Sequence, residues 1–222
     1  MRDVVLELSE RTPHAFGSHR LKQAATLQWW QEVAPKCEIY ISQYVNTEAR
    51  GGDSKRAALR CESMRGVSAI DASVPDVTEL ANLLMRGHAV PDCESPDVIH
   101  IAAAAVYGMD VLLTLNCKHM ANPVTLPITA TVIAKAGYQC PIVITSGGFL
   151  GAKGGIRAMM NEKVRMEDPM EEIYAIRREI SARYGHDVYR LAEAAKEWMK
   201  RDQASGIRYV RLPIARRTPT VV

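Results

Sequence analysis

The sequence predicts a three-layer α/β/α protein with a mostly parallel sheet, followed by a C-terminal helical arm. Over about the first 150 residues, short and wholly apolar strand-like segments alternate with segments of helical period. Strands of this kind are typical of parallel sheets that helices cover on both faces. After a glycine-rich stretch, two amphipathic segments follow with no strand between them, and this indicates an arm that lies on the sheet domain.

The elements of the first half are predicted from period and composition. LKQAATLQWWQEV (21–33) has the apolar spacing of an amphipathic helix, and EIYIS (38–42) is rich in residues that favour strands. DSKRAALRCESM (53–64) is predicted to be helical. PDVTELANLLMRG (75–87) is also predicted to be a helix, because a proline stands at its start and a glycine just past its end.

The second half of the sheet domain repeats this alternation. The alanine-rich stretch at 97–107 predicts a buried helix, and VLLTL (111–115) predicts a strand. PITATVIAKAG (127–137) predicts a further helix closed by glycine, and PIVIT (141–145) another apolar strand. We therefore assign residues 1–150 to one α/β domain.

The last third of the chain predicts a linker and an arm. Residues 151–164 form a glycine-rich linker, and residues 165–222 an arm of two helices with a basic, extended tail. The first arm helix (168–185) begins with a capping pattern and carries an apolar stripe; the second runs from Asp187 to about Arg201. The stripe of the first helix consists of Ile173, Ile176, Ile180 and Tyr184, and that of the second of Val188, Leu191, Ala195 and Trp198. Two such helices need a surface on which to bury these stripes.

Composition and charge exclude several classes of protein. The chain has 222 residues, 47% of them apolar, without a run of apolar residues long enough for a membrane span, so we expect a cytoplasmic protein with no membrane partner. Its five cysteines contain no CxxC pair, which argues against a disulfide framework or a zinc knuckle. The net charge of +3 divides into −2 (13 basic, 15 acidic) for residues 1–150 and +5 (15 basic, 10 acidic) for the rest.

Three polar residues are predicted to meet at one edge of the sheet. Asp97 falls in the first turn of its helix, Glu48 follows the strand at 38–42, and Asn116 follows the strand at 111–115. In folds of this class, sites lie beyond the carboxyl ends of parallel strands. Two acids and an amide there suit a divalent metal and an activated water. The alternative for Asp97 is a helix cap, which stabilises the helix through its dipole and has no role in chemistry.

These segments resemble the PIN-domain ribonucleases, in particular the VapC-type toxins of type II toxin–antitoxin systems. The resemblance covers about residues 20–150 and is carried by DVIHIAAAAVYGMDVLLTLNCKHMANP, IYISQYVNTE and GYQCPIVITSGGFL. It implies an Mg²⁺- or Mn²⁺-dependent endoribonuclease with an RNA substrate. Glu48 and Asp97 would be metal-binding and catalytic acids, and Asn116 a third catalytic residue.

The family also has an aspartate at the end of its first strand. Asp3 is the only aspartate before residue 53 and is therefore the candidate third metal ligand, although it precedes its apolar residues instead of following them. Without a third acid, the alternative is a catalytically impaired PIN-like module that binds RNA or a protein partner. His100 and His119 lie beside these positions, and we expect His100 to pack or hydrogen-bond within the fold.

The arm resembles the small antitoxins encoded beside this PIN subgroup, over about residues 160–215. The resemblance implies a fusion in which an arm arginine faces the acids of the toxin, in cis or from another chain, with a homodimer as one possible assembly. The candidate inhibitory arginines are Arg208, Arg211, Arg216 and Arg217. A solvated tail or an RNA-steering patch is the alternative.

Overall fold

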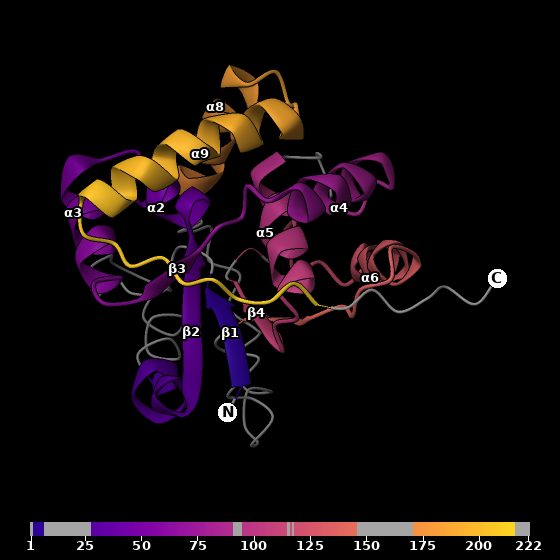
Figure 1. Cartoon of the computed structure of the whole chain (residues 1–222), viewed down its shortest axis with the longest axis horizontal. Helices are drawn as coiled ribbons and strands as arrows, with labels where there is room; N and C mark the ends of the chain where they lie inside the picture. Colours follow the sequence, from indigo (N-terminus) through magenta and orange to yellow (C-terminus); the bar gives the residue numbers. More distant parts are fainter. Residues whose placement is uncertain are drawn as a thin grey trace, which may run out of the picture.

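The structure is a computed structural model that describes residues 28–90, 95–114, 116, 118–145 and 171–215, together with the backbone of 2–6. Figure 1 shows the arrangement of its helices and strands. Their bounds in chain order are β1 Arg2–Leu6, η1 Ala34–Lys36, β2 Cys37–Ser42, α2 Gln43–Ala49, α3 Ser54–Ser63, β3 Ser68–Ile70, α4 Pro75–Arg86, α5 Ser95–Val106, β4 Val111–Leu113, α6 Leu126–Lys135, β5 Ile142–Ile144, α8 Glu171–Arg183 and α9 Val188–Ala204.

The described strands form one parallel sheet of five, in the order β3-β2-β1-β4-β5. This confirms the predicted mixed α/β class with a parallel sheet. Because every strand runs the same way, all the carboxyl ends lie at one edge. That edge faces α2 and the two arm helices, α8 and α9 (Figure 1).

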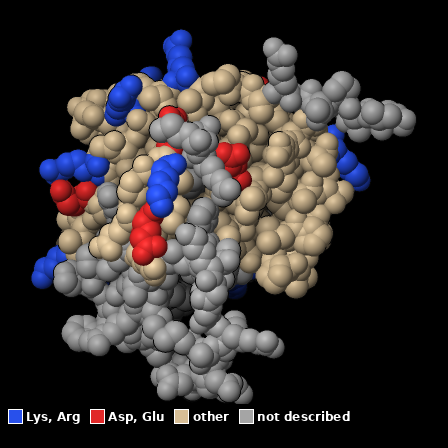
Figure 2. Space-filling model, turned by 90° about the horizontal axis from the view of Figure 1, so that it is seen from below, with Lys and Arg blue, Asp and Glu red and all other residues tan. Residues whose placement is uncertain are grey.

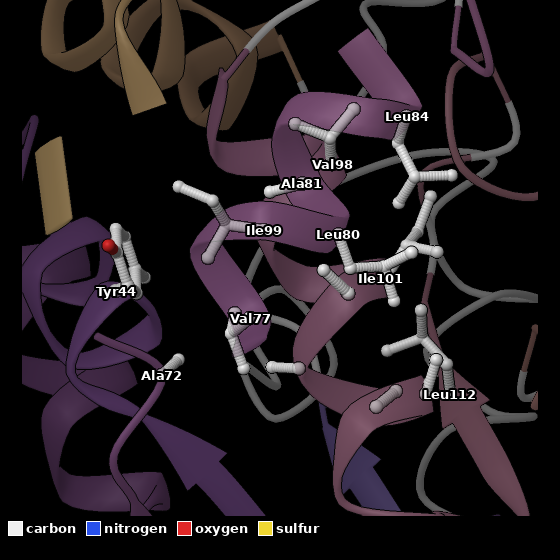
Figure 3. Packing of buried hydrophobic residues seen from close by; sticks show 14 of the residues in the cluster. Tyr44, Ala72, Val77, Leu80, Ala81, Leu84, Val98, Ile99, Ile101 and Leu112 are labelled. Carbon is white, nitrogen blue, oxygen red and sulfur yellow. The ribbon is translucent and has the colours of Figure 1, made fainter. Parts of the chain in front are cut away.

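Buried apolar side chains lie on both faces of the sheet. Along β2, Tyr40 belongs to one buried cluster and Ile41 to the other; along β4, Leu112 and Leu113 divide in the same way. Neighbouring residues of a strand point to opposite faces, so this division shows that both faces are covered. The larger cluster is dominated by contacts between α4 and α5 (Figure 3). Each large aliphatic side chain buried there contributes roughly 1.5–3 kcal/mol.

Most of the predicted elements of the sheet domain are present. The predicted helices at 53–64, 75–87, 97–107 and 127–137 appear as α3, α4, α5 and α6, and the predicted strands as β2, β4 and β5. Of the helix predicted at 21–33, only residues 28–33 are described; residues 28–32 are helical and residue 33 is a turn.

Four elements were not predicted from period and composition: β1, η1, α2 and β3. The helix α2 follows β2 without a glycine or proline, and QYVNTEA contains aromatic and β-branched residues that favour strands. Its start is set by Ser42, whose side chain accepts a hydrogen bond from the Val45 amide. The strand β3 has only three residues, too few to show a period in the sequence.

The arm packs on the sheet domain of its own chain. The predicted stripe residues Ile173, Ile176 and Ile180 are all buried, as are Val188 and Leu191. The helix α8 contacts α5 and α2, and α9 contacts α2, α4 and α5. The predicted linker at 151–164 lies outside the described residues, as do the capping residues at 168 and 169.

After α9 the chain runs along the outer edge of the sheet. The Ala69 amide of β3 donates to the Arg208 carbonyl at 2.8 Å, and the Val210 amide donates to the Ala69 carbonyl at 2.8 Å. Farther on, the Ala215 amide donates to the Val106 carbonyl at the end of α5. The tail therefore covers the edge strand β3, whose backbone groups would otherwise be open to pairing.

Candidate acidic site beneath the arm

Glu48 reaches the carboxyl edge of the sheet on α2. This helix begins directly after β2 and is buried along nearly its whole length, including the Glu48 side chain, which is fully buried. A carboxylate in such a position is costly unless other groups bond to it. The local fold thus places an acid where it must have partners.

Asp97 and Asn116 reach the same edge from two other elements. Asp97 lies in the first turn of α5 and is fully buried. Asn116 follows β4 in a tight turn, in which its amide donates to the Thr114 hydroxyl and its side-chain oxygen accepts from the His119 amide. The Asn116 side chain then donates to Asp97 at 3.2 Å. The carboxylate of Asp97 therefore bonds to a side chain from another element, as expected if Asp97 belongs to a site rather than serving only as a helix cap.

Arg177 of α8 joins the two acids. One guanidinium nitrogen lies 2.8 Å from a Glu48 oxygen, and another lies 2.7 Å from an Asp97 oxygen. The Arg177 side chain is 1% exposed, so this bridge is shielded from water. Charge-assisted bonds of this length are the strong ones in proteins. The arm therefore inserts a cation between the two predicted metal-binding acids.

Two histidines bond to the remaining oxygens of the acids. His100 Nε2 lies 2.9 Å from Glu48, and His119 Nδ1 lies 2.8 Å from Asp97. The expectation that His100 hydrogen-bonds within the fold is confirmed. Tyr174 of α8 lies against the His119 ring and donates its hydroxyl to Asn116 at 3.3 Å. The arm thus contacts all three of the predicted catalytic residues.

The electrostatics of Glu48 reflect this environment. Complete burial by itself raises the pKa of the Glu48 carboxyl, because a charge is poorly solvated there. The Arg177 guanidinium and His100 outweigh burial and lower the pKa to about 2. Glu48 is therefore an ionised carboxylate whose charge depends on the arm.

The backbone of Asp3 lies away from these residues. The backbone of Asp3 pairs with Glu38 near the amino end of β2, whereas Leu6 pairs with Leu113 at the carboxyl end of β4. Three residues of strand separate Asp3 from Leu6, which corresponds to roughly 10 Å. This register argues against the assignment of Asp3 as a metal ligand, because the other end of the β1 backbone faces the acids.

Two of the predicted inhibitory arginines, Arg208 and Arg211, do not lie at the buried acids. Arg208 and Arg211 are exposed and lie along the edge of β3, where the tail pairs through its backbone. Arg216 and Arg217 lie outside the described residues. The arginine at the acids is Arg177 instead. Its sequence signal is its place within the apolar stripe of α8, four residues after Ile173 and three before Ile180.

The acids at this edge of the sheet meet only part of what a metal-ion site needs. Glu48 and Asp97 offer the carboxylate oxygens that Mg²⁺ and Mn²⁺ prefer, whereas the Asn116 side-chain oxygen accepts from the His119 amide. Within the described ranges, however, no three residues of His, Cys, Asp and Glu are arranged so as to hold a metal ion. The two acids instead bind the Arg177 guanidinium. A metal ion at this position would need the two carboxylates that the arm already binds.

Two further groups of ion pairs fix the arm, and in both the arm supplies the acid and the sheet domain the arginine. Asp202 of α9 is fully buried and accepts from Asn46, Arg50 and the Tyr209 hydroxyl. Glu172 of α8 binds arginines of α3. The arm thus brings one cation to the acids and two carboxylates to arginines of the sheet domain.

Comparison with models of known protein families gives no match, and comparison with curated protein sequences gives none either. None of the helices in the described part of the chain combines the length and the apolar character needed to span a bilayer.

Proposed function

We propose that the chain is a PIN-like metal-dependent endoribonuclease, the toxin of a type II toxin–antitoxin system, that carries its own neutralising arm. The fold would be the three-layer α/β/α arrangement of that family. The observation that carries the proposal is the Arg177 bridge: two buried acids from separate elements converge, and an arm arginine neutralises them. A buried acid pair with no role would be costly to keep, since apolar residues can replace such pairs without loss of stability.

In the active form, Glu48 and Asp97 would hold Mg²⁺ or Mn²⁺, with Asn116 beside them. A bound divalent ion supplies a polarised water and neutralises charge on the phosphate that is attacked. Asn116 orients Asp97 through the 3.2 Å bond, and the two histidines hold the outer oxygens of the acids. Glu48 therefore has one oxygen fixed by His100 and one directed to the cation, and the Asp97 oxygen that is directed to the cation also accepts from Asn116.

The arm excludes metal and RNA together. Arg177 binds the same carboxylate oxygens that a divalent ion would need, and α8 covers the edge of the sheet where an RNA strand would have to lie. Because the arm is tethered, its effective concentration at the site is in the millimolar range, so even a weak contact stays mostly formed. The docking partner is the chain's own arm.

The position of Asp3 favours a second candidate, a catalytically impaired PIN-like module that binds RNA or a protein partner. With Asp3 at the amino end of β1, the described residues supply two carboxylates to the site instead of three. Mg²⁺ gives up its water reluctantly and needs negative charge nearby, so a two-acid site would bind it weakly. This candidate predicts binding without cleavage.

Release of Arg177 distinguishes the two candidates. The full-length Arg177→Gln variant is incubated with single-stranded RNA and Mn²⁺, and cleavage is followed on a gel beside the wild type and Arg178→Gln. Arg178 is exposed and pairs with Glu171, so its replacement is a matched control. The nuclease proposal expects cleavage by Arg177→Gln alone.

The second mutation in this background is Asp97→Asn. If the double variant cuts RNA as fast as Arg177→Gln, the site is not the one described here. If Arg177→Gln is folded and binds RNA but does not cut it, the impaired module is the correct function.

A further inference from the structure

A second ion site lies at the end of α2, next to the acids. The Glu172 carboxylate of α8 accepts a hydrogen bond from the Asp53 amide at 2.8 Å and lies 3.1 Å from Arg60 and 3.5 Å from Arg56. We call Gly52, Asp53, Arg56 and Arg60 the anion cradle. Partial burial by itself raises the pKa of Glu172, and the amide and the two guanidiniums outweigh it, so the pKa lies below its ordinary value.

The sheet domain builds this cradle without help from the arm. Arg60 donates through Nε to the Ala49 carbonyl and through Nη2 to the Gly51 carbonyl, which leaves Nη1 for the anion. Asp53 begins α3 by accepting from the Arg56 amide, and this directs its own amide to the anion. The guanidinium and the amide are therefore held in place by the fold.

Gly52 makes the room for the anion. Its φ is +71°, a conformation that side chains disfavour, and a Cβ at this position would lie 2.4 Å from the Glu172 oxygen. The loop thus has the two features of a backbone anion site, an aimed amide and an absent side chain. A carboxylate from the arm is its occupant in this structure.

The rim of the cradle is open to solvent. The Arg56 side chain is 63% exposed and Glu172 is 21% exposed, so another anion can reach the site when Glu172 does not hold it. The Arg50 site differs in this respect, because its partner Asp202 is fully buried and held by several donors. On the face shown in Figure 2, the described Lys and Arg residues are dispersed, and several lie next to acids.

From these observations we propose that the anion cradle binds a backbone phosphate of single-stranded RNA, and that Glu172 occupies it as a substrate mimic. A phosphodiester presents two oxygens to a guanidinium as a carboxylate does. Glu48 is one short turn before the cradle on α2, and its carbonyl accepts from the Gly51 amide. An RNA strand held there would pass the acids. The arm therefore blocks the path of the substrate at two places: Arg177 covers the acids, and Glu172 fills the cradle. This inference rests on the proposed nuclease function for the choice of RNA.

The test measures RNA binding in EDTA, where no cleavage can occur. A short fluorescein-labelled oligoribonucleotide is titrated with full-length Glu172→Gln and with full-length Glu171→Gln, and anisotropy is recorded. Glu171 is the neighbouring exposed acid, so the two variants have the same net charge. We expect Glu172→Gln to bind RNA roughly tenfold more tightly than Glu171→Gln, because one charge-assisted contact becomes available.

A second substitution locates the contact. In the Glu172→Gln background, Arg56→Ala should reverse most of the gain and reduce the slope of log K against log salt by about 0.7, the value for one phosphate on a single strand. If Glu172→Gln does not accumulate as folded protein, Glu172→Asp serves instead, since it withdraws the carboxylate by one methylene. Equal affinity of the Glu172 and Glu171 variants, or a gain that Arg56→Ala leaves intact, would overturn the proposal.

This outcome is independent of catalysis. A cradle that binds RNA in a chain whose Arg177→Gln variant does not cut it would support the RNA contact and refute the nuclease. Cleavage by Arg177→Gln, with no change in RNA affinity in Glu172→Gln, would support the nuclease and refute the RNA contact at the cradle.

Discussion

Replacing Arg177 by alanine should make folding of this protein depend on divalent ions. The substitution leaves the Glu48 and Asp97 carboxylates buried without the guanidinium that joins them. Removing one partner of a buried ion pair costs about 3–5 kcal/mol, because the remaining charge is uncompensated. For a chain of 222 residues, each kcal/mol corresponds to about 2–4 °C, so the variant should melt about 6–20 °C below the wild type in EDTA.

Metal should restore much of this loss. A ligand that binds only the folded state at about a hundred times its Kd adds about 2.7 kcal/mol. In Arg177→Ala the two carboxylates are available to Mn²⁺, whereas in the wild type the guanidinium competes for the same oxygens. The melting temperature of the variant should therefore rise with Mn²⁺ while that of the wild type stays nearly constant.

The assay is thermal unfolding followed by circular dichroism, in EDTA and across an Mn²⁺ titration. Arg178→Ala is the matched control; its side chain is exposed and pairs with the exposed Glu171, so it should change stability by less than about 0.5 kcal/mol. A variant as stable as the wild type in EDTA would refute the bridge. A destabilised variant that Mn²⁺ fails to rescue would refute the metal site.

Three further perturbations test the electrostatics and the docking of the arm. The pKa of Glu48 is lowered from 4.5 to about 2 in the folded state, so its contribution of about 3 kcal/mol to the free energy of unfolding is fully present above pH 4.5 and is lost as the pH falls toward 2. Midpoints of urea unfolding over this pH range should show the loss. An equal loss in Arg177→Ala would mean that Arg177 is not the cause of the lowered pKa. Asp202→Ala leaves Arg50 and the Tyr209 hydroxyl without their acceptor and should lower the free energy of unfolding by about 3 kcal/mol in urea titrations, against less than about 0.5 kcal/mol for the exposed Glu193→Ala. Val210→Pro removes the amide that bonds to the Ala69 carbonyl, so the Ala69 amide should exchange hydrogen faster, and unchanged exchange would mean that the tail does not hold this edge.

The convergence of Glu48, Asp97 and Asn116 could be expected from the sequence for a general reason. Each follows or begins an element whose period and composition are clear, and parallel strands bring their carboxyl ends to one edge whatever the details of packing. The short elements α2 and β3 were not predicted from period and composition, because neither spans enough residues to show a period. The helix that carries Glu48 forms because Ser42 caps it and because it is buried on almost every side.

The arginine that meets the acids was assigned to the wrong part of the arm. The basic tail has the higher density of charge, yet Arg208 and Arg211 remain exposed, because the tail pairs with β3 through its backbone. Arg177 reaches the acids because the apolar stripe of α8 carries it to the interface. Burial selects the one arginine on the packed face, and local charge density does not indicate that face.

The sequence alone determined the mixed α/β class, the acids at one edge and the amphipathic character of the arm, because these follow from periods and spacings within single segments. Tertiary structure decided the rest: the register that separates Asp3 from the acids, the Arg177 bridge, and the closure of the anion cradle by Glu172. Each of these joins residues far apart in the chain. Their partners are chosen by how whole elements pack, and no local pattern of residues records that choice.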